Sequence, residues 1–152
     1  MKRNFFTFDK LGGEYPSLAD DIRRGTPTAV FGVFDSLKYL LAGLIDAPVV
    51  YITTDFVSAK KAAENIAALS GKQTQTLKSK DEVLLYRKAV SKDALFQRLS
   101  ALHGFYNGDG TQILTAEIDA LLQLFPKKLP SISLQEGEDF DFLSLAPRLV
   151  QM

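Results

Sequence analysis

The sequence contains no cysteine and a single histidine, His103. Without cysteine the chain has no disulfide and no thiolate for catalysis or metal binding. One histidine also leaves little for a zinc or iron site, because such sites commonly combine several imidazole or thiolate ligands. His103 has no serine, cysteine and carboxylate arrangement near it in the sequence, so we interpret it as a charge at the C-terminal end of a helix.

Net charge and long apolar runs are also missing. Lys and Arg together number 18 and balance 18 Asp and Glu, so no overall field attracts the chain to a polyanion. The basic pairs Arg23–Arg24 and Lys127–Lys128 would form local patches, but both also suit helix C-termini. The longest apolar run, Tyr39–Ile45, is far shorter than a bilayer span, and residues 1–6 lack the apolar core of a signal peptide. We therefore expect a cytoplasmic protein without a membrane partner.

Length and composition predict one globular domain, or one domain and the beginning of another. The 152 residues are 46% apolar and 24% charged, which is typical of folded proteins and excludes wholesale disorder. β-Branched runs alternate with stretches of helical periodicity, and this alternation predicts an α/β fold with a parallel sheet of three or four strands. The expected strands are Thr28–Phe31, Val49–Thr53, Thr74–Leu77, Thr111–Thr115 and Ser131–Leu134.

Helices are predicted between these strands from apolar spacing and capping residues. Gly25 and Gly71 follow two of them, at the position where helices commonly end. The β-branched composition of Val49–Thr53 predicts a strand buried on both faces. The segment Lys78–Val90 is polar with a weakly helical middle. The expected helices are Leu18–Arg24 capped by Ser17, a helix to Ile45 capped by Asp35 or Ser36, residues 55–70 opened by Asp55, Ser91–Leu102 capped by Ser91 with an apolar face of Leu95, Phe96, Leu99 and Leu102, Ala116–Phe125, and Asp139–Met152.

The segment Thr28–Ile45 has the order strand, tight turn and helix, in which a nucleotide-binding phosphate loop would lie. Such a loop follows the pattern G-x-x-x-x-G-K-[ST], because backbone amides surround the phosphates, a lysine contacts them and a hydroxyl holds magnesium. Only Gly32 of this pattern remains, and Lys38 is followed by Tyr39 instead of Ser or Thr. The sequence therefore predicts a phosphate-loop position that has lost its chemistry.

Bulky side chains add to this loss. Phe31, Val33 and Phe34 stand where the backbone of a working loop curls around an anion, so we expect them to fill the phosphate position. We expect no catalytic residue, bound cofactor or metal in this chain. The degenerate phosphate-loop position comprises Phe31, Gly32, Val33, Phe34, Asp35, Ser36, Leu37 and Lys38.

Acidic residues do not supply the missing magnesium site. A helicase-type strand ends in an adjacent acidic pair, whereas Asp55 and Glu117 each stand alone before an amphipathic run. We interpret both as residues at the start of a helix, where negative charge is favourable. The acidic stretch Glu136–Asp141 would suit a cation, but we favour a solvated turn leading into a helix.

The order of these segments resembles the N-terminal module of bacterial transcription-repair coupling factor (Mfd), a module that is itself similar to the nucleotide-excision-repair protein UvrB. The resemblance covers nearly the whole chain from about Ala19 onward and depends on the order and spacing of its parts. These parts are Ile22–Gly25 with Thr28–Ile45, Pro48–Ala59, Ser91–Leu102, Gln112–Leu122 and Ser133–Leu143.

The resemblance implies a RecA-like, P-loop-type sheet with a degenerate nucleotide site, and a role other than that of the motor. In this family, separate helicase-type lobes use ATP and magnesium to translocate on DNA and displace stalled RNA polymerase. The UvrB-like module recruits UvrA through an inserted domain and contacts other domains of the same chain to restrain it. The implied organisation is a UvrB-like domain at 1–128 and the truncated start of the inserted domain at 129–152, which carries little of the UvrA-binding surface.

Two other functions remain open at this point. The first is a divergent nucleotide-binding domain of a helicase-type ATPase, with Lys38 as a shifted phosphate contact. The loss of glycines around Phe34, Asp35 and Ser36 argues against it. The second is a stand-alone binder of single-stranded DNA, which predicts steeply salt-dependent binding and is disfavoured by the zero net charge.

Overall fold

A computed structural model of the protein describes residues 7–80, 92–108, 112–123, 125, 130–132, 134–137 and 139–150. The chain has an α/β fold, as predicted, built on a three-stranded parallel sheet with the strand order β1–β3–β2. The strands are β1 (Val49–Thr53), β2 (Thr74–Leu77) and β3 (Ile113–Glu117). The helices are α1 (Phe8–Leu11), α2 (Tyr15–Arg24), α3 (Asp35–Leu44), α4 (Phe56–Ser70), α5 (Lys92–Tyr106), α6 (Ile118–Leu121) and α7 (Phe142–Val150).

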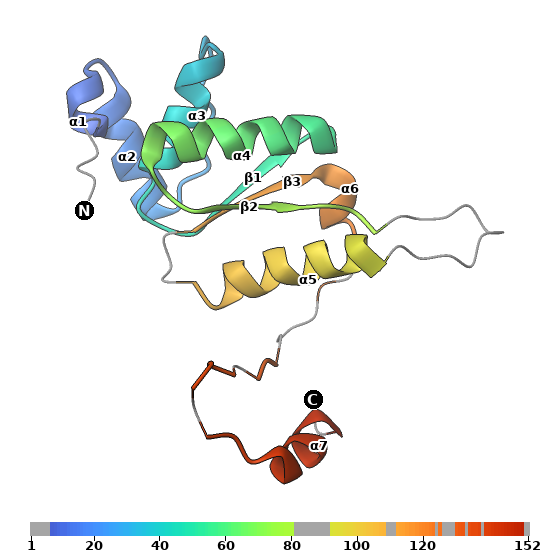
Figure 1. Cartoon of the computed structure of the whole chain (residues 1–152). Coiled ribbons are helices and arrows are strands. Elements are labelled where there is room, and N and C mark those ends of the chain that lie inside the picture. Colours follow the sequence, from blue (N-terminus) through green and yellow to red (C-terminus); the bar gives the residue numbers. More distant parts are fainter. Residues whose placement is uncertain are drawn as a thin grey trace, which may run out of the picture.

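Helices cover both faces of the sheet, with α4 on one face and α5 on the other (Figure 1). Helix α7 lies apart from these layers. Within the described residues, no helix has the length and apolar character needed to cross a membrane. The structure therefore supports a small three-layer arrangement for the body of the chain.

The central strand β3 is buried along its whole length, whereas the strands beside it are only partly buried. Ile113 aligns with Val49 on one side and with Thr74 on the other. Thr115 is fully buried, and its Oγ1 donates to Oγ1 of Thr76 at 3.1 Å, which satisfies a polar group that would otherwise be costly to bury. The buried run Ile113–Thr115 thus forms the core of the sheet.

Helices α3 and α4 cover one face of the sheet. Their apolar side chains form a single cluster with β3, made of Tyr39, Ala42, Ala62, Ile66 and Ile113, with Val49 and Tyr51 of β1 packed against it. The two helices approach closely at Gly43, where an added Cβ would lie 2.6 Å from Cβ of Ser70. Glycine at this position therefore sets the distance between α3 and α4.

Helix α5 covers only the β2 and β3 part of the opposite face. Its buried residues are Ala94, Arg98, Ala101 and Leu102, and two of them join a cluster with Leu77, Leu114, Ala116 and Ala120. The predicted apolar face is wrong, apart from Leu102, because Leu95, Phe96 and Leu99 are 42%, 64% and 38% exposed. The small residues Ala94 and Ala101 allow α5 to lie close to the sheet, and the larger side chains turn outward.

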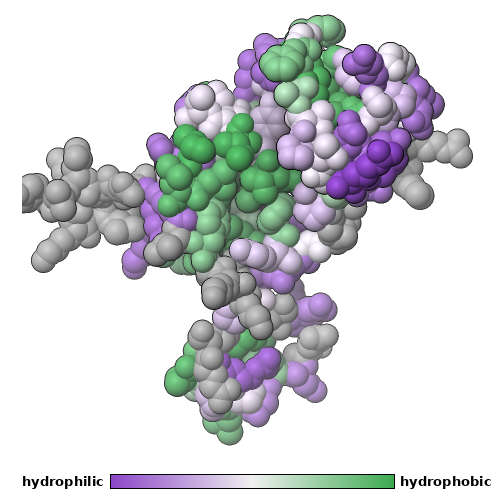
Figure 2. Space-filling view, turned by 180° about the vertical axis from the view of Figure 1, so that it is seen from behind, coloured by the Kyte–Doolittle hydropathy of each residue, from purple (hydrophilic) through white to green (hydrophobic). Residues whose placement is uncertain are grey.

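On the face of the sheet that α5 covers, the apolar side chains of β1 remain exposed. Val50 and Ile52 of β1 are 44% and 54% exposed, so the prediction that Val49–Thr53 is buried on both faces is wrong. Apolar side chains are also gathered at the surface in the view from behind (Figure 2). Strand β1 is buried on the α3 side and open on the other.

Two predicted strands are not strands in the described residues. Thr28–Phe31 is an irregular segment between α2 and α3, and residues 131, 132 and 134 of the predicted Ser131–Leu134 strand are also irregular. Both segments have strand-like composition, but a strand also needs a neighbour to pair with. The strand predicted at Thr111–Thr115 is present but displaced, because β3 runs from Ile113 to Glu117 in register with β1.

Helix ends agree with the sequence where a capping residue fixes them. Gly25 and Gly71 end α2 and α4 with left-handed φ values of 69° and 70°, as predicted. Helix α2 begins at Tyr15, earlier than predicted, because Ser17 lies inside it and donates its hydroxyl to the carbonyl of Glu14 at 2.7 Å. The helix predicted at Ala116–Phe125 is reduced to α6, because its first residues belong to β3.

Some predictions lie outside the described residues. They are most of the Lys78–Val90 segment, the cap Ser91, Thr111, the basic pair Lys127–Lys128 with the domain boundary at 128 and 129, and the end of the last helix at 151–152. The division into 1–128 and 129–152 therefore stays a prediction.

Candidate functional site

The predicted phosphate-loop position lies where an irregular segment enters the first turn of α3. Phe34 is the N-cap residue of α3, in an extended conformation, and Asp35 is the first residue of the helix. Gly32 has a φ of 72°, a left-handed conformation that favours glycine. The segment before α3 thus bends at Gly32 in a conformation that favours glycine.

The aromatic side chains of the loop are exposed. Phe31 is 89% exposed and Phe34 is 73% exposed, so both rings are largely in solvent. That their bulk occupies the anion position stays a prediction. An extended N-cap residue and a preceding turn leave these side chains without a packed layer to enter.

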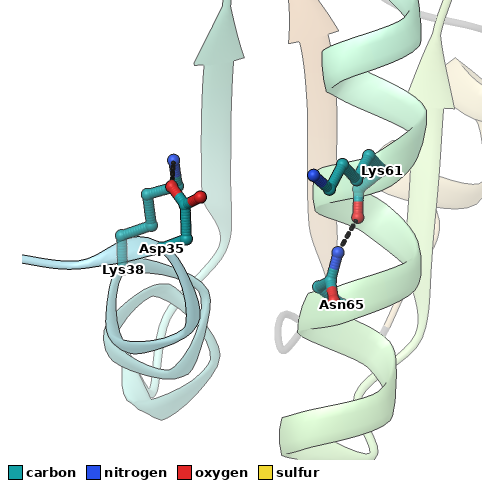
Figure 3. A network of polar contacts seen from close by, with 4 residues as sticks. All are labelled: Asp35, Lys38, Lys61 and Asn65. Carbon is teal, nitrogen blue, oxygen red and sulfur yellow. Dashed lines mark hydrogen bonds and ion pairs between the residues drawn. The ribbon is translucent and has the colours of Figure 1, made fainter.

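The first turn of α3 instead holds an ion pair between two predicted site residues. Lys38 Nζ donates to Asp35 Oδ1 at 2.8 Å, between side chains that are 40% and 82% exposed (Figure 3). The hydrogen bond and the charge of Lys38 hold the pKa of Asp35 below its ordinary value, and Lys61 of α4 contributes less. The same hydrogen bond raises the pKa of Lys38. Both groups are therefore ionised and paired near neutral pH.

This pair opposes the binding of a phosphate. In a phosphate loop, the lysine and the amides at the helix N-terminus both face the anion. Here the carboxylate of Asp35 lies at that N-terminus and accepts the hydrogen bond of Lys38. A phosphate group at this position would meet a negative charge and a lysine that already has a partner.

Lys38 also lies next to Tyr39, whose ring packs near that of Tyr51. Its Nζ is 5.1 Å from the ring centroid of Tyr39, a cation–π geometry, and the rings of Tyr39 and Tyr51 are 6.0 Å apart. Burial raises the pKa of the Tyr51 hydroxyl, while Lys38 acts to lower it. Through the Tyr39 ring, the Lys38 side chain contacts the packed cluster of α3 and β1. These contacts keep the ammonium group close to α3.

The two acidic residues predicted to start helices have different partners. Asp55 is the N-cap of α4, as predicted, and its Oδ1 accepts from the backbone N–H of Ser58 at 2.8 Å. Glu117 occupies the N-cap position of α6, but its Oε1 accepts from the backbone N–H of Ser79 at 2.9 Å. Glu117 therefore joins the end of β2 to β3. His103 is exposed in the last turn of α5, in agreement with the prediction.

Comparisons with models of known protein families, with curated proteins and with solved structures find no match. The proposal below therefore depends on the fold and on the geometry around Asp35 and Lys38.

Sequence reasoning missed one buried charge, Arg98 of α5. It is 3% exposed, and its Nη1 and Nη2 donate to the carbonyls of Lys78 at 2.9 Å and Ala120 at 3.3 Å. Its guanidinium lies 5.2 Å from the ring centroid of Phe125, and burial lowers its pKa. Arg98 joins the end of β2 to α6. The signal available in the sequence was the helical row of small residues at Ala94 and Ala101, which places Arg98 on the inner side.

Proposed function

We propose that this chain is a non-catalytic scaffold module, of the UvrB-like type found at the N-terminus of transcription-repair coupling factor. The observation that carries the proposal is the Asp35–Lys38 pair, which puts a carboxylate at the helix N-terminus where a nucleotide enzyme would hold a phosphate. The single turn glycine, Gly32, agrees with a phosphate loop that has lost its function.

The fold supports the same proposal at a coarser level. A parallel sheet with helices on both faces is the arrangement expected of a RecA-like domain. The proposed role is to contact other domains of the parent protein and to restrain its ATP-driven motor until UvrA is recruited. ATP, magnesium, DNA and RNA polymerase would then be partners of the rest of the parent protein.

The test adds the 152-residue chain to a coupling-factor motor that lacks its own N-terminal module. We expect the chain to co-elute with the motor and to lower its rate of ATP hydrolysis. An unrelated protein of similar size and zero net charge serves as the control. Absence of both co-elution and inhibition would contradict the proposed restraining role.

A further inference from the structure

In the sheet formed by the described residues, strand β1 is an edge strand with hydrogen-bonding groups that face away from β3. The backbone N–H of Val49 donates to the carbonyl of Gln112 at 3.2 Å, toward β3. Alternate residues of a strand direct their N–H and C=O groups to opposite sides, so those of Val50 and Ile52 face the free edge. The sequence Val-Val-Tyr-Ile-Thr contains no charge, proline or glycine, the devices that commonly block an exposed edge.

The side chains beside this edge are apolar and uncovered on the α5 side. Val50 and Ile52 pair in register with Leu114 and Ala116 of β3, which are 3% and 0% exposed beneath α5. Val50 and Ile52 themselves remain 44% and 54% exposed, because α5 packs over β2 and β3. The apolar surface seen from behind lies on this side of the molecule (Figure 2).

The other side of the same edge borders a hollow of about 540 Å³. Helix α2, helix α3, the segment after Gly25 and strand β1 all contribute to its lining. Mostly apolar side chains line it, including Leu18, Ile22, Val30, Ile45, Val49 and Tyr51. The β1 edge is therefore bordered by exposed apolar side chains on one side of the sheet and by the apolar hollow on the other.

Two residues of the predicted strand Thr28–Phe31 also line this hollow. Thr28 and Val30 line the hollow together with Val49 and Tyr51, yet the segment forms no strand. Its composition favours an extended conformation, and what it lacks is a neighbour with which to form a ladder. The hollow is thus lined by β1 and by a second segment of strand-like composition that has no ladder partner.

We propose that the free edge of β1 binds a β-strand of a partner protein, with apolar side chains at alternate positions. The added strand would continue the β1–β3–β2 sheet by pairing with the N–H and C=O groups of Val50 and Ile52. One row of its side chains would enter the hollow, and the other would lie beside Val50 and Ile52. A helix would cover one face only and leave the edge groups unpaired, so an extended segment fits better.

This inference goes beyond the proposed scaffold function and does not depend on it. The test uses the ¹⁵N-labelled chain and a synthetic, end-capped peptide of alternating valine and threonine. We expect saturable chemical-shift changes along β1 and slower amide hydrogen exchange at Val50 and Ile52. The matched control is the same peptide with N-methyl groups on alternate residues, which removes its main-chain donors and should abolish binding.

A pair of protein variants completes the test. Ile52→Pro removes an outward-facing N–H and should eliminate peptide binding while the β2 and β3 signals stay in place, whereas Tyr51→Pro removes a donor that faces β3 and should disturb the sheet. If Ile52→Pro does not fold, the comparison of the two peptides still decides. Equal binding of both peptides, shifts confined to β2, no binding at all, or burial of β1 by a second copy in sedimentation would overturn the proposal.

Discussion

Helices α3 and α4 pack side by side, but the aspartates at their starts accept hydrogen bonds from different groups. Asp55 precedes α4 and accepts from the backbone N–H of Ser58 at 2.8 Å and from its hydroxyl at 2.7 Å. Asp35 is already inside α3 and accepts from the side chain of Lys38 instead. One carboxylate caps the backbone, and the other neutralises a lysine.

The difference shows how each helix start is held. The first turn of α4 is fixed by a local cap, whereas α3 has no side-chain cap and begins in an exposed loop. The buried residues of α3, Tyr39 to Gly43, come one turn later and hold it against α4. A residual phosphate loop would need a free lysine and an uncharged helix start, and α3 offers neither.

The largest effect is expected from the contact that joins the two helices. Gly43→Ala would place a Cβ 2.6 Å from Cβ of Ser70, so the helices must separate. We expect a loss of about 1–3 kcal/mol in the free energy of unfolding, measured by urea denaturation. The control is Gly104→Ala in α5, whose Cβ would meet only the movable side chain of Gln75, at 3.2 Å. Equal stability of the two variants would show that α3 and α4 are not held this closely.

A smaller effect separates the two aspartates. Asp55→Ala should lower the melting temperature more than Asp35→Ala, because only Asp55 satisfies a backbone donor of its helix. The hydrogen bonds from Ser58 hold the pKa of Asp55 below its ordinary value. Its stabilising effect is therefore present above the unfolded-state pKa and is lost as the pH falls through the lower folded-state pKa. Asp55→Asn keeps the cap without titrating, and should show a weaker pH dependence; identical pH profiles would contradict this.

The smallest effect concerns the ion pair of α3. Lys38→Ala should raise the pKa of Asp35 toward its ordinary value, as followed by carboxyl ¹³C NMR. The melting temperature should change little, because the pair is largely exposed. Lys61→Ala is the matched control and should move the same pKa less. If Lys38→Ala leaves the pKa of Asp35 unchanged, the ion pair does not persist in solution.

Elements whose bounds depend on strand propensity or on a capping residue were predictable from the sequence. Strands β1 and β2 coincide with Val49–Thr53 and Thr74–Leu77, and α4 runs from the cap Asp55 to Gly71 as predicted. Thr28–Phe31 shows the opposite case, because its composition favours a strand but strand formation depends on a partner far away in the sequence. Propensity alone does not supply that partner.

Side-chain exposure was harder to predict than backbone structure. Helix α5 has apolar residues on two sides, and packing against β2 and β3 selected the side with small residues and Arg98. At the candidate site, the departure of residues 31–38 from the phosphate-loop pattern was visible in the sequence. The spacing of Asp35 and Lys38, three residues apart on a helix, also permitted the ion pair to be foreseen. The exposure of Phe31 and Phe34 was not predictable, because it depends on how the chain crosses from α2 to α3.

A titration of the 152-residue chain with a fluorescent ATP analogue and magnesium tests directly whether the start of α3 binds a nucleotide. The Asp35–Lys38 pair predicts no saturable binding, and no change when Lys38→Ala is tested beside the unmodified chain. Micromolar binding that Lys38→Ala abolishes would contradict the account and would support a divergent nucleotide-binding domain instead.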